Sequence, residues 1–434
     1  MKIYLFIVLF LTLITASTYA EESTRLDLDE CIRIALNKNK NILSAEQSAV
    51  KTYAQIDENK ALAYPDIYAS ADYTRIGNII EYELNGRKFS FTPEDNYKIY
   101  LNLKQKVYAP QIFEAIKASK SFAKAAELQI KIVKTETVSK VKKAYYFLIL
   151  AKELIKINEE SILQLQRNVE DVKKRYKIGM VTDYDLLRAE VQLANAMPAL
   201  TKAKYDYEIA LTNLKMIMGM KPSSSIKIDG KLNYLPLKIS IDKAINNAID
   251  RRAEIEHINH TIETYDRYLK ITKKETLPTL TMHGDVTYAN NEISSGGKAN
   301  WKYQWNIGIT LDYKLFDGGG SRSKKIEALS DLTKARINKD QLISKIHVEV
   351  KTAFSALMET DDLIASQEKG IEKAERAYEI ATARNENGLM TQLELMDVQL
   401  ALTTARINYS KSIYEYLAAL TDLQKAMGTI LEDI

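Results

Sequence analysis

Residues that interrupt helices or crosslink chains are scarce in this sequence. The 434 residues include only 7 prolines, 15 glycines and 1 cysteine. A single cysteine excludes an internal disulfide framework, and Cys31 is best interpreted as a small, half-buried helix residue. Few prolines and glycines indicate long uninterrupted helices. The 61 basic residues nearly balance the 57 acidic ones, so composition gives no sign of nucleic-acid binding.

Long hydrophobic runs are missing beyond the N-terminus. Met1 and Lys2 form a short positive end, Ile3–Ala16 is almost wholly apolar, and small residues precede Glu21. This pattern predicts a secretory signal peptide over residues 1–20, with an N-terminal anchor helix as the alternative. Nowhere else does the chain reach the roughly 18 to 20 apolar residues of a spanning helix. If the mature chain enters a membrane, it does so through strands.

Motifs of catalysis and metal binding are absent as well. The chain has no His-Glu-x-x-His and no Gly-x-Ser-x-Gly, and 318–320 lacks the Gly-Lys-Ser/Thr ending of a phosphate loop. His257 and His260 have a metal-compatible spacing but no evident third ligand, so we interpret them as surface or packing residues. We expect no catalytic residue, no cofactor and no metal site.

What the chain does contain is an internal repeat. LDECIRIALNKNKNI from Leu28 matches IDKAINNAIDRRAEI from Ile241, and YPDIYASAD from Tyr64 matches LPTLTMHGD from Leu277 at the same offset. These matches predict two structural repeats, 21–227 and 228–434, each with helices, two strands and a helical hairpin.

The predicted helices of each hairpin are very long. Residues 111–177 contain neither proline nor glycine, and apolar residues recur there at spacings of three and four. Such a helix extends ~100 Å, which exceeds any compact domain core. We place the two helical hairpins at 111–218 and 319–428.

Each hairpin turns on a similar short motif, RYKIGMVT in the first repeat and RNENGLMT in the second. Gly179 and Gly388 stand where glycines end helices, and Thr182 and Thr391 where a hydroxyl caps the next helix. An exposed tip is normally polar, yet four tip residues are apolar, which predicts docking onto a partner. The alternative is that they only staple their own hairpin. The four are Met180, Val181, Leu389 and Met390.

Four segments alternate polar and apolar residues with the period of a strand: about 65–75, 97–108, 278–289 and 303–315. Ten or more residues are enough for a tilted strand to cross a bilayer. We expect apolar residues to face lipid and polar ones a barrel lumen, although a solvent-facing sheet packed on helices would alternate equally. The segments 77–96 and 290–300 are then loops outside the cell. The expected lumen residues are Asp72, Lys98, Lys104, His283, Asp285 and Asp312.

Four strands cannot close a barrel, and an open edge in lipid would leave backbone groups without hydrogen bonds. Closure therefore needs several chains. Eight strands leave an interior filled by side chains, whereas about twelve begin to open a lumen, so a trimer is the economical arrangement for a conduit.

The order of elements, together with LPTL before a strand, YKLFDGG at a strand-to-helix joint and the two tip motifs, resembles the TolC family of outer-membrane efflux proteins. The resemblance implies a mainly α fold with a membrane β-barrel. It implies a homotrimer in the bacterial outer membrane, with four strands per protomer in a twelve-stranded barrel and a long α-helical coiled-coil tunnel in the periplasm. Partners are then a periplasmic adaptor and an inner-membrane transporter.

The family resemblance also implies a periplasmic gate. Glu394 and Asp397 match two acidic family positions, and three copies would give a ring of carboxylates that favours cations. Asp185 matches an acidic position at the first tip, and Arg188 is placed to pair with an acidic neighbour. The alternative is that these are ordinary solvated charges on a coiled-coil surface.

We therefore expect a passive channel of a tripartite efflux or type I secretion system, opened when its partners dock. A channel dedicated to protein secretion or to metal cations fits the same sequence. The alternative from another class is a periplasmic coiled-coil scaffold or adaptor without a pore, which would not need four amphipathic strands.

Overall fold

The computed structural model describes residues 24–293 and 299–432, so the expected signal peptide lies outside the described residues. The described chain is mostly helical, and a helical membrane span, which needs a long and nearly uncharged apolar stretch, occurs nowhere in it. Its helices are α2 (Leu28–Lys38), α3 (Lys40–Ala61), α4 (Pro110–Lys177), α5 (Asp183–Ile217), α6 (Ile241–Arg251), α7 (Ala253–Lys274), α8 (Gly320–Glu386) and α9 (Gln392–Ala426). Its longer strands are β2 (Asp66–Arg75), β5 (Asp95–Tyr108), β7 (Thr279–Ile293) and β8 (Ala299–Asp312).

The chain divides into two compact units. One, here called the hairpin unit, comprises the described residues 24–43, 132–252 and 345–432. The other, the sheet unit, comprises 44–131 and 253–344. Each unit takes segments from both sequence halves, and α4 and α8 contribute residues to both units.

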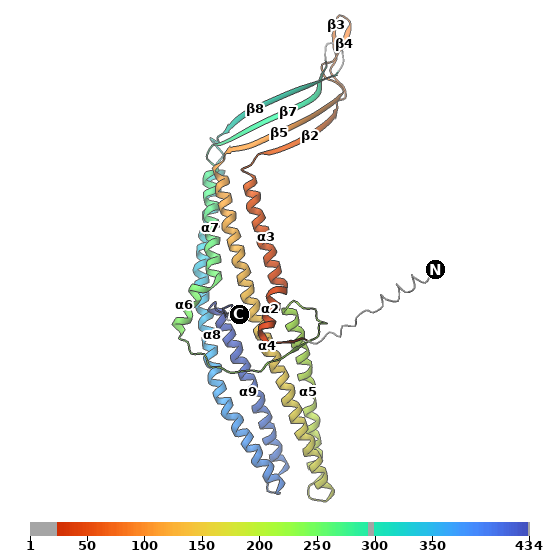
Figure 1. Ribbon diagram of the computed structural model, residues 1–434, viewed down its shortest axis with the longest axis vertical. Coiled ribbons are helices and arrows are strands. Elements are labelled where there is room, and N and C mark those ends of the chain that lie inside the picture. Colours follow the sequence, from red (N-terminus) through yellow and green to blue (C-terminus); the bar gives the residue numbers. More distant parts are fainter. Residues whose placement is uncertain (1–23, 294–298, 433–434) are drawn as a thin grey trace, which may run out of the picture. The chain divides into compact units, whose positions relative to one another are not determined.

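The sheet unit contains a four-stranded antiparallel sheet in the order β2-β5-β7-β8 (Figure 1). Its register places Asp72 opposite Lys98, Lys104 opposite His283, and Asp312 opposite Thr279. Opposite residues in a ladder point to the same face, and the register likewise places Asp285 opposite Asn102. The polar faces expected for the separate strands therefore form one polar face of the sheet, as the alternation predicts.

The other face of this sheet is apolar and exposed. Trp305 and Ile307 on β8 expose 63% and 70% of their surface, and Ile67 on β2 exposes 59%. Tyr288 and Trp301 stack with ring centroids 4.7 Å apart, close to the end of β7 and the start of β8. An apolar face of this size needs a cover that the described chain does not supply.

Two expected loops contain strand. The segment 290–300 is partly strand, since β7 continues to Ile293 and β8 begins at Ala299. The segment 77–96 holds a small hairpin of β3 (Tyr82–Leu84) and β4 (Arg87–Phe89), so the expectation of plain loops was wrong. Asn85 and Gly86 turn this hairpin with φ of 51° and 72°, and Asn-Gly is the pair favoured where both turn residues need positive φ.

The side chain of Asn290 on β7 extends the hydrogen bonding between β5 and β7 at the end of their ladder. Its Oδ1 accepts from the Tyr97 amide at 2.5 Å, and its Nδ2 donates to the Asp95 carbonyl at 3.2 Å. The register between β7 and β8 shifts just after Ala289. The amide therefore supplies the donor and acceptor that a regular strand would give at this point.

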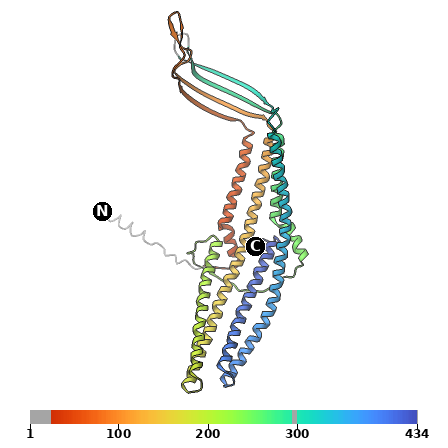
Figure 2. The same cartoon turned by 180° about the vertical axis from the view of Figure 1, so that it is seen from behind.

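The hairpin unit is built around a core where α2, α4 and α5 meet, with Ile32, Val138 and Leu214 almost fully buried. Beside it, β1 (Thr24–Leu26) pairs in parallel with β6 (Ile226–Ile228). These strands of three residues are too short to give a recognisable alternation. Seen from two sides, each long helix lies beside its return helix, α4 with α5 and α8 with α9 (Figures 1 and 2).

An extended strap, residues 229–237, crosses the helices of the hairpin unit. The Tyr145 hydroxyl on α4 donates to the Asp229 carbonyl at 2.8 Å, and Tyr234 bonds to Asp361 on α8. Tyr416 on α9 donates to the Leu235 carbonyl at 2.9 Å. Three helices are thus fastened to one strap by tyrosine hydroxyls.

Candidate functional site at the hairpin tips

The first tip joins α4 to α5 within the hairpin unit. Gly179 has φ of 74°, and the Met180 amide bonds back to the Arg175 carbonyl at 2.9 Å, which is the Schellman closure of a helix end. Thr182 then caps α5: its hydroxyl accepts from the Asp185 amide at 3.2 Å, and the Asp185 carboxylate accepts from the Thr182 amide at 3.0 Å.

The second tip joins α8 to α9 with the same construction. Gly388 has φ of 71°, and the Leu389 amide bonds to the Arg384 carbonyl at 2.8 Å. The Thr391 hydroxyl accepts from the Glu394 amide at 3.3 Å, while the Glu394 carboxylate accepts from the Thr391 amide at 2.9 Å. The predicted glycine ends and threonine caps are therefore confirmed at both tips.

These capping bonds favour the charged form of two expected gate residues, Asp185 and Glu394. Hydrogen bonds from Thr182, with the positive charge of Arg188 nearby, lower the pKa of Asp185 below its ordinary value. Hydrogen bonds from Thr391 lower the pKa of Glu394 in the same way. The ionised form of both carboxylates is thus favoured, and each also holds the first turn of its own helix. The Thr-x-x-Asp and Thr-x-x-Glu spacing signals this second role in the sequence.

The apolar tip residues are only partly covered. Met180 exposes 71% and Leu389 68% of their surface, while Val181 and Met390 are half-buried. Two large apolar side chains thus project from the ends of the hairpins. A surface of this kind suits contact with another protein.

Arg188 and Asp397 line one cleft of about 530 Å³ between α4, α5 and α9. Arg188 is half-buried and donates to the Tyr184 hydroxyl at 3.5 Å, whereas Asp397 is exposed. Arg188 forms no ion pair with any carboxylate among residues 24–293 and 299–432. The structure thus brings two of the four expected gate residues into one cleft, and pairing of Arg188 with another protomer stays a prediction.

A seam of polar contacts joins the two hairpins along α4 and α9. Gln392 donates to Asn168 at 2.6 Å near the tips, and further up Arg406 donates to Glu160 at 3.2 Å. Hydrogen bonds therefore connect α9 to α4 both near the tips and further along the helices. Sequence reasoning missed this seam, because its partners lie more than 200 residues apart in sequence.

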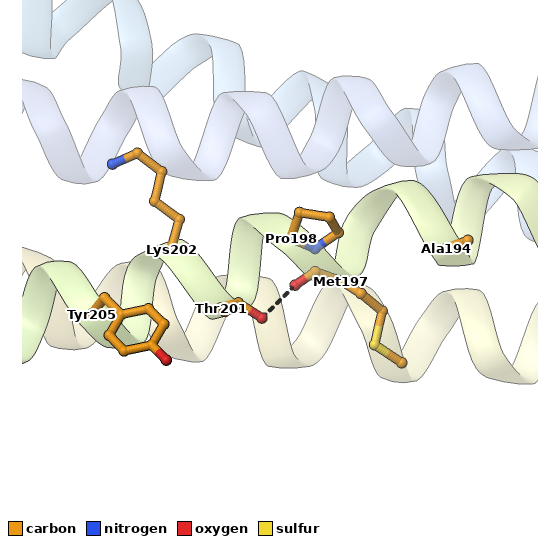
Figure 3. Close-up of a pocket in the computed structure, with 6 residues that line it drawn as sticks. All are labelled: Ala194, Met197, Pro198, Thr201, Lys202 and Tyr205. Carbon is orange, nitrogen blue, oxygen red and sulfur yellow. Dashed lines mark hydrogen bonds between the residues drawn. The ribbon is translucent and has the colours of Figure 1, made fainter.

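A shallow depression lies on α5 (Figure 3), where Pro198 has no amide to give to the Ala194 carbonyl. The Thr201 hydroxyl donates to the Met197 carbonyl at 3.2 Å, and Tyr205 exposes 68% of its surface. The lining offers apolar area and few convergent polar groups. It therefore has the character of a packing surface rather than of a ligand pocket.

Comparison with known proteins decides the family. The model of a family described as outer membrane efflux protein matches residues 31–220 and 244–429. The chain belongs to the outer membrane efflux protein family. The resemblance to TolC-type proteins is thereby confirmed, and with it the expectation of an outer-membrane protein.

Relatives of this outer membrane efflux protein have low sequence identity to it but align with most of its length. Outer membrane protein TolC of Vibrio cholerae is 20% identical over 434 residues, covering 99% of this chain and 95% of the relative. The cation efflux system protein CusC of Escherichia coli K12 is 19% identical over 389 residues, covering 88% and 83%. The alkaline protease secretion protein AprF of Pseudomonas aeruginosa is 20% identical over 343 residues, covering 78% and 71%.

Solved structures agree with this family fold. The Campylobacter jejuni CmeC outer membrane channel superposes with a TM-score of 0.80 at 19% identity, covering 93% of this chain and 85% of the other. The open state of the Neisseria gonorrhoeae MtrE outer membrane channel gives 0.75 at 17% identity, covering 93% and 89%. The roles of individual tip and gate residues in this efflux protein remain predictions.

Proposed function

We propose that this efflux protein is a passive exit duct in the outer membrane, which opens when a periplasmic adaptor and an inner-membrane transporter dock at its tips. The observation that carries the proposal is the sheet register, which gathers the polar residues on one face and leaves the opposite, apolar face exposed. A face of exposed tryptophan and isoleucine suits lipid, and the polar face suits a water-filled lumen.

The open edges of the same sheet support a homotrimer. Strands β2 and β8 each pair on one side only within the described chain. Unpaired backbone groups are not tolerated in lipid, so neighbouring copies must complete the ladder. Three copies of four strands give a twelve-stranded barrel, which is wide enough for a lumen. The exposed apolar stripe of α5, which includes Leu187, Val191 and Ile209, would be covered by the neighbouring hairpins of an α-helical tunnel.

A two-fold internal repeat, 21–227 and 228–434, accounts for the helix lengths. Helices α2 and α6 both have 11 residues, α3 and α7 both have 22, and α5 and α9 both have 35. In the assembled trimer, Glu394 and Asp397 would form the carboxylate ring of the gate, with Asp185 and Arg188 beside it. Met180, Val181, Leu389 and Met390 would meet the adaptor.

A periplasmic scaffold without a pore would have no use for a sheet with one polar face and one exposed apolar face. The direct test is the conductance of the detergent-purified protein in a planar bilayer, with its oligomer mass measured alongside. We expect trimers and small currents that grow when the tip charges are removed. Monomers that pass no current in any variant would refute the duct.

Two neighbouring residues of β8 provide a matched test of the faces. Trp305 lies on the apolar face and Asn306 on the polar face. Trp305→Lys would place a charge against lipid, at a cost of about 2 to 4 kcal/mol near the bilayer midplane, whereas Asn306→Lys would face water. Loss of carbonate-resistant membrane insertion is expected only for Trp305→Lys. Equal insertion of both variants would mean that the apolar face does not meet lipid.

A further inference from the structure

The two hairpin tips have the same backbone conformation but differ in charge. Gly179, Thr182 and Asp185 correspond in conformation and bonding to Gly388, Thr391 and Glu394. Before the glycines, Arg175 and Arg384 correspond, but four other positions differ in charge or polarity. In the first tip they are Lys173, Lys174, Lys177 and Ile178, and in the second they are Thr382, Ala383, Glu386 and Asn387.

Helix termination does not require this basic cluster. Cations near the C-terminus of a helix interact well with its dipole, so lysines there are often structural. However, α8 ends in the same closure with Arg384 as the basic residue of its last turn, while α4 has Lys174, Arg175 and Lys177 there. The second tip therefore shows that the fold forms without the three lysines.

Within the described part of a single chain the three lysines are exposed and have no acidic partner. Lys173, Lys174 and Lys177 are all exposed, and within residues 24–293 and 299–432 none forms an ion pair. Arg175 differs, because it pairs with Asp171 at 3.1 Å. Beside the lysines, Ile178 and Met180 each expose 71% of their surface. The first tip thus presents unpaired positive charge around two apolar side chains.

We propose that the first tip, and not the second, is the electrostatic anchor for docking, and that its occupant is an acidic helical end of the periplasmic partner. Carboxylates of that partner would pair with Lys173, Lys174 and Lys177. Between these carboxylates, an apolar notch of the partner would receive Ile178 and Met180. This inference rests on the proposed function, because it assumes that the tips are the docking end. Leu389 at the second tip supplies apolar contact without charge selection.

A protein fits this tip better than an anionic lipid surface does. Binding of a segment to a membrane surface grows with the apolar area it buries, and this rigid turn projects only two large apolar side chains. Asp183 and Asp185 lie in the first turn of α5, just beyond the turn, so both signs of charge are present at this tip. A mixed pattern of this kind selects a partner of complementary pattern and gives its binding a salt dependence.

The second tip supplies a matched control for the test. In one variant the first tip takes the residues of the second: Lys173→Thr, Lys174→Ala and Lys177→Glu. In the reciprocal variant the second tip takes those of the first: Thr382→Lys, Ala383→Lys and Glu386→Lys. The probes are three synthetic helical-hairpin peptides with acidic, neutral or basic loop ends, and vesicles containing phosphatidylglycerol. Binding to the full-length detergent-purified protein is measured by surface plasmon resonance at two salt concentrations.

We expect the acidic hairpin to bind the native protein most tightly, and salt to weaken its binding. Loss of three exposed ion pairs, together with the repulsive carboxylate of Lys177→Glu, should weaken binding of the acidic hairpin at least about tenfold in the first variant. The reciprocal variant should gain affinity for the acidic hairpin. Unchanged binding after the exchange, equal binding of the basic hairpin, or binding to vesicles alone would overturn the inference.

Conductance and oligomer mass of the same samples separate this failure from failure of the proposed function. If trimers conduct but the charge exchange has no effect, the acidic occupant is wrong and the duct stands. If the native protein forms no trimer and passes no current, the duct itself is wrong.

Discussion

The guanidinium of Arg175, near the end of α4, donates a hydrogen bond of 3.1 Å to the main-chain carbonyl of Asn385, near the end of α8. Asp171, one turn earlier on α4, holds the same guanidinium through its Nε at 3.1 Å. Asn385 is only 8% exposed, so its carbonyl has little access to water as a substitute. The two hairpins are thus tied together close to their tips within one protomer.

Replacing this arginine should loosen one tip from the other. Arg175→Lys keeps the charge but loses the planar fork that reaches Asp171 and Asn385 together. We expect faster amide hydrogen exchange at 384–390, by about five- to tenfold for a lost hydrogen bond of ~1 kcal/mol. Arg167→Lys is the control, since Arg167 is exposed on the same helix. Equal exchange in both variants would show that the link does not hold the tips.

Acid should loosen the caps at the tips. The folded-state pKa of Asp185 and that of Glu394 are both lowered, so the stability they contribute is fully present above the unfolded-state pKa. It is lost as pH falls through the folded-state pKa. The positive charge of Arg188 contributes to the lowered pKa of Asp185, and that of Arg384 to the lowered pKa of Glu394.

The measurement is the mobility of a spin label at Met180→Cys or Leu389→Cys, in a Cys31→Ala background, as pH is lowered from 7. We expect mobility to rise below the ordinary carboxyl range, at about pH 4 and lower. Thr182→Ala and Thr391→Ala should make the respective tip mobile already at neutral pH. A flat profile in the native tips would show that the capping carboxylates do not order them.

Gly388 at the second tip is required because of its backbone conformation, not because a side chain would clash with its surroundings. A Cβ at Gly388 would meet nothing within 4 Å, but the φ of 71° is one that other residues adopt only at a cost of about 1 kcal/mol or more. Gly388→Ala should therefore destabilise the tip. Gly370→Ala, in the middle of α8 with equally open space, should instead stabilise its helix by roughly 0.5 to 1 kcal/mol. Local hydrogen exchange measures both, and a same-signed effect would contradict this account.

Much of this fold can be predicted from sequence, because its long elements carry strong periodicity. The polar faces of the four strands follow from alternation alone, and the tip glycines and threonines follow from their positions. The parallel pair β1 and β6 gives no such signal, since three residues per strand carry no measurable pattern. The hairpin at Asn85–Gly86 was missed although its turn pair was visible. The shared cleft of Arg188 and Asp397 depends on packing between helices far apart in sequence.

The choice of substitution at Glu394 can separate the effect of its charge on the gate from its effect as a helix cap. Glu394→Ala would remove both the carboxylate and the cap, whereas Glu394→Gln keeps a side chain that suits the capping box. The double variant Glu394→Gln with Asp397→Asn should therefore weaken block of the pore by multivalent cations while leaving the tip ordered. Single-channel currents with and without such ions test this. Unchanged block would discard the carboxylate ring.

The tyrosine strap should contribute measurably to the stability of the hairpin unit. Tyr416 is 1% exposed, and its hydroxyl accepts from the Leu237 amide at 2.8 Å besides donating to the Leu235 carbonyl. Tyr416→Phe would leave both strap groups without their partner, which costs about 1 to 3 kcal/mol when such groups are buried. We expect a lower unfolding midpoint and earlier proteolysis within residues 229–237.

Tyr414, two residues earlier on α9, is the control for this strap prediction. Its ring packs edge-on against Phe147 with centroids 5.6 Å apart, and among the described residues its hydroxyl has no hydrogen-bond partner. Tyr414→Phe should therefore change the unfolding midpoint little. If the two variants lose stability equally, the ring of Tyr416 rather than its hydroxyl holds the strap against α9.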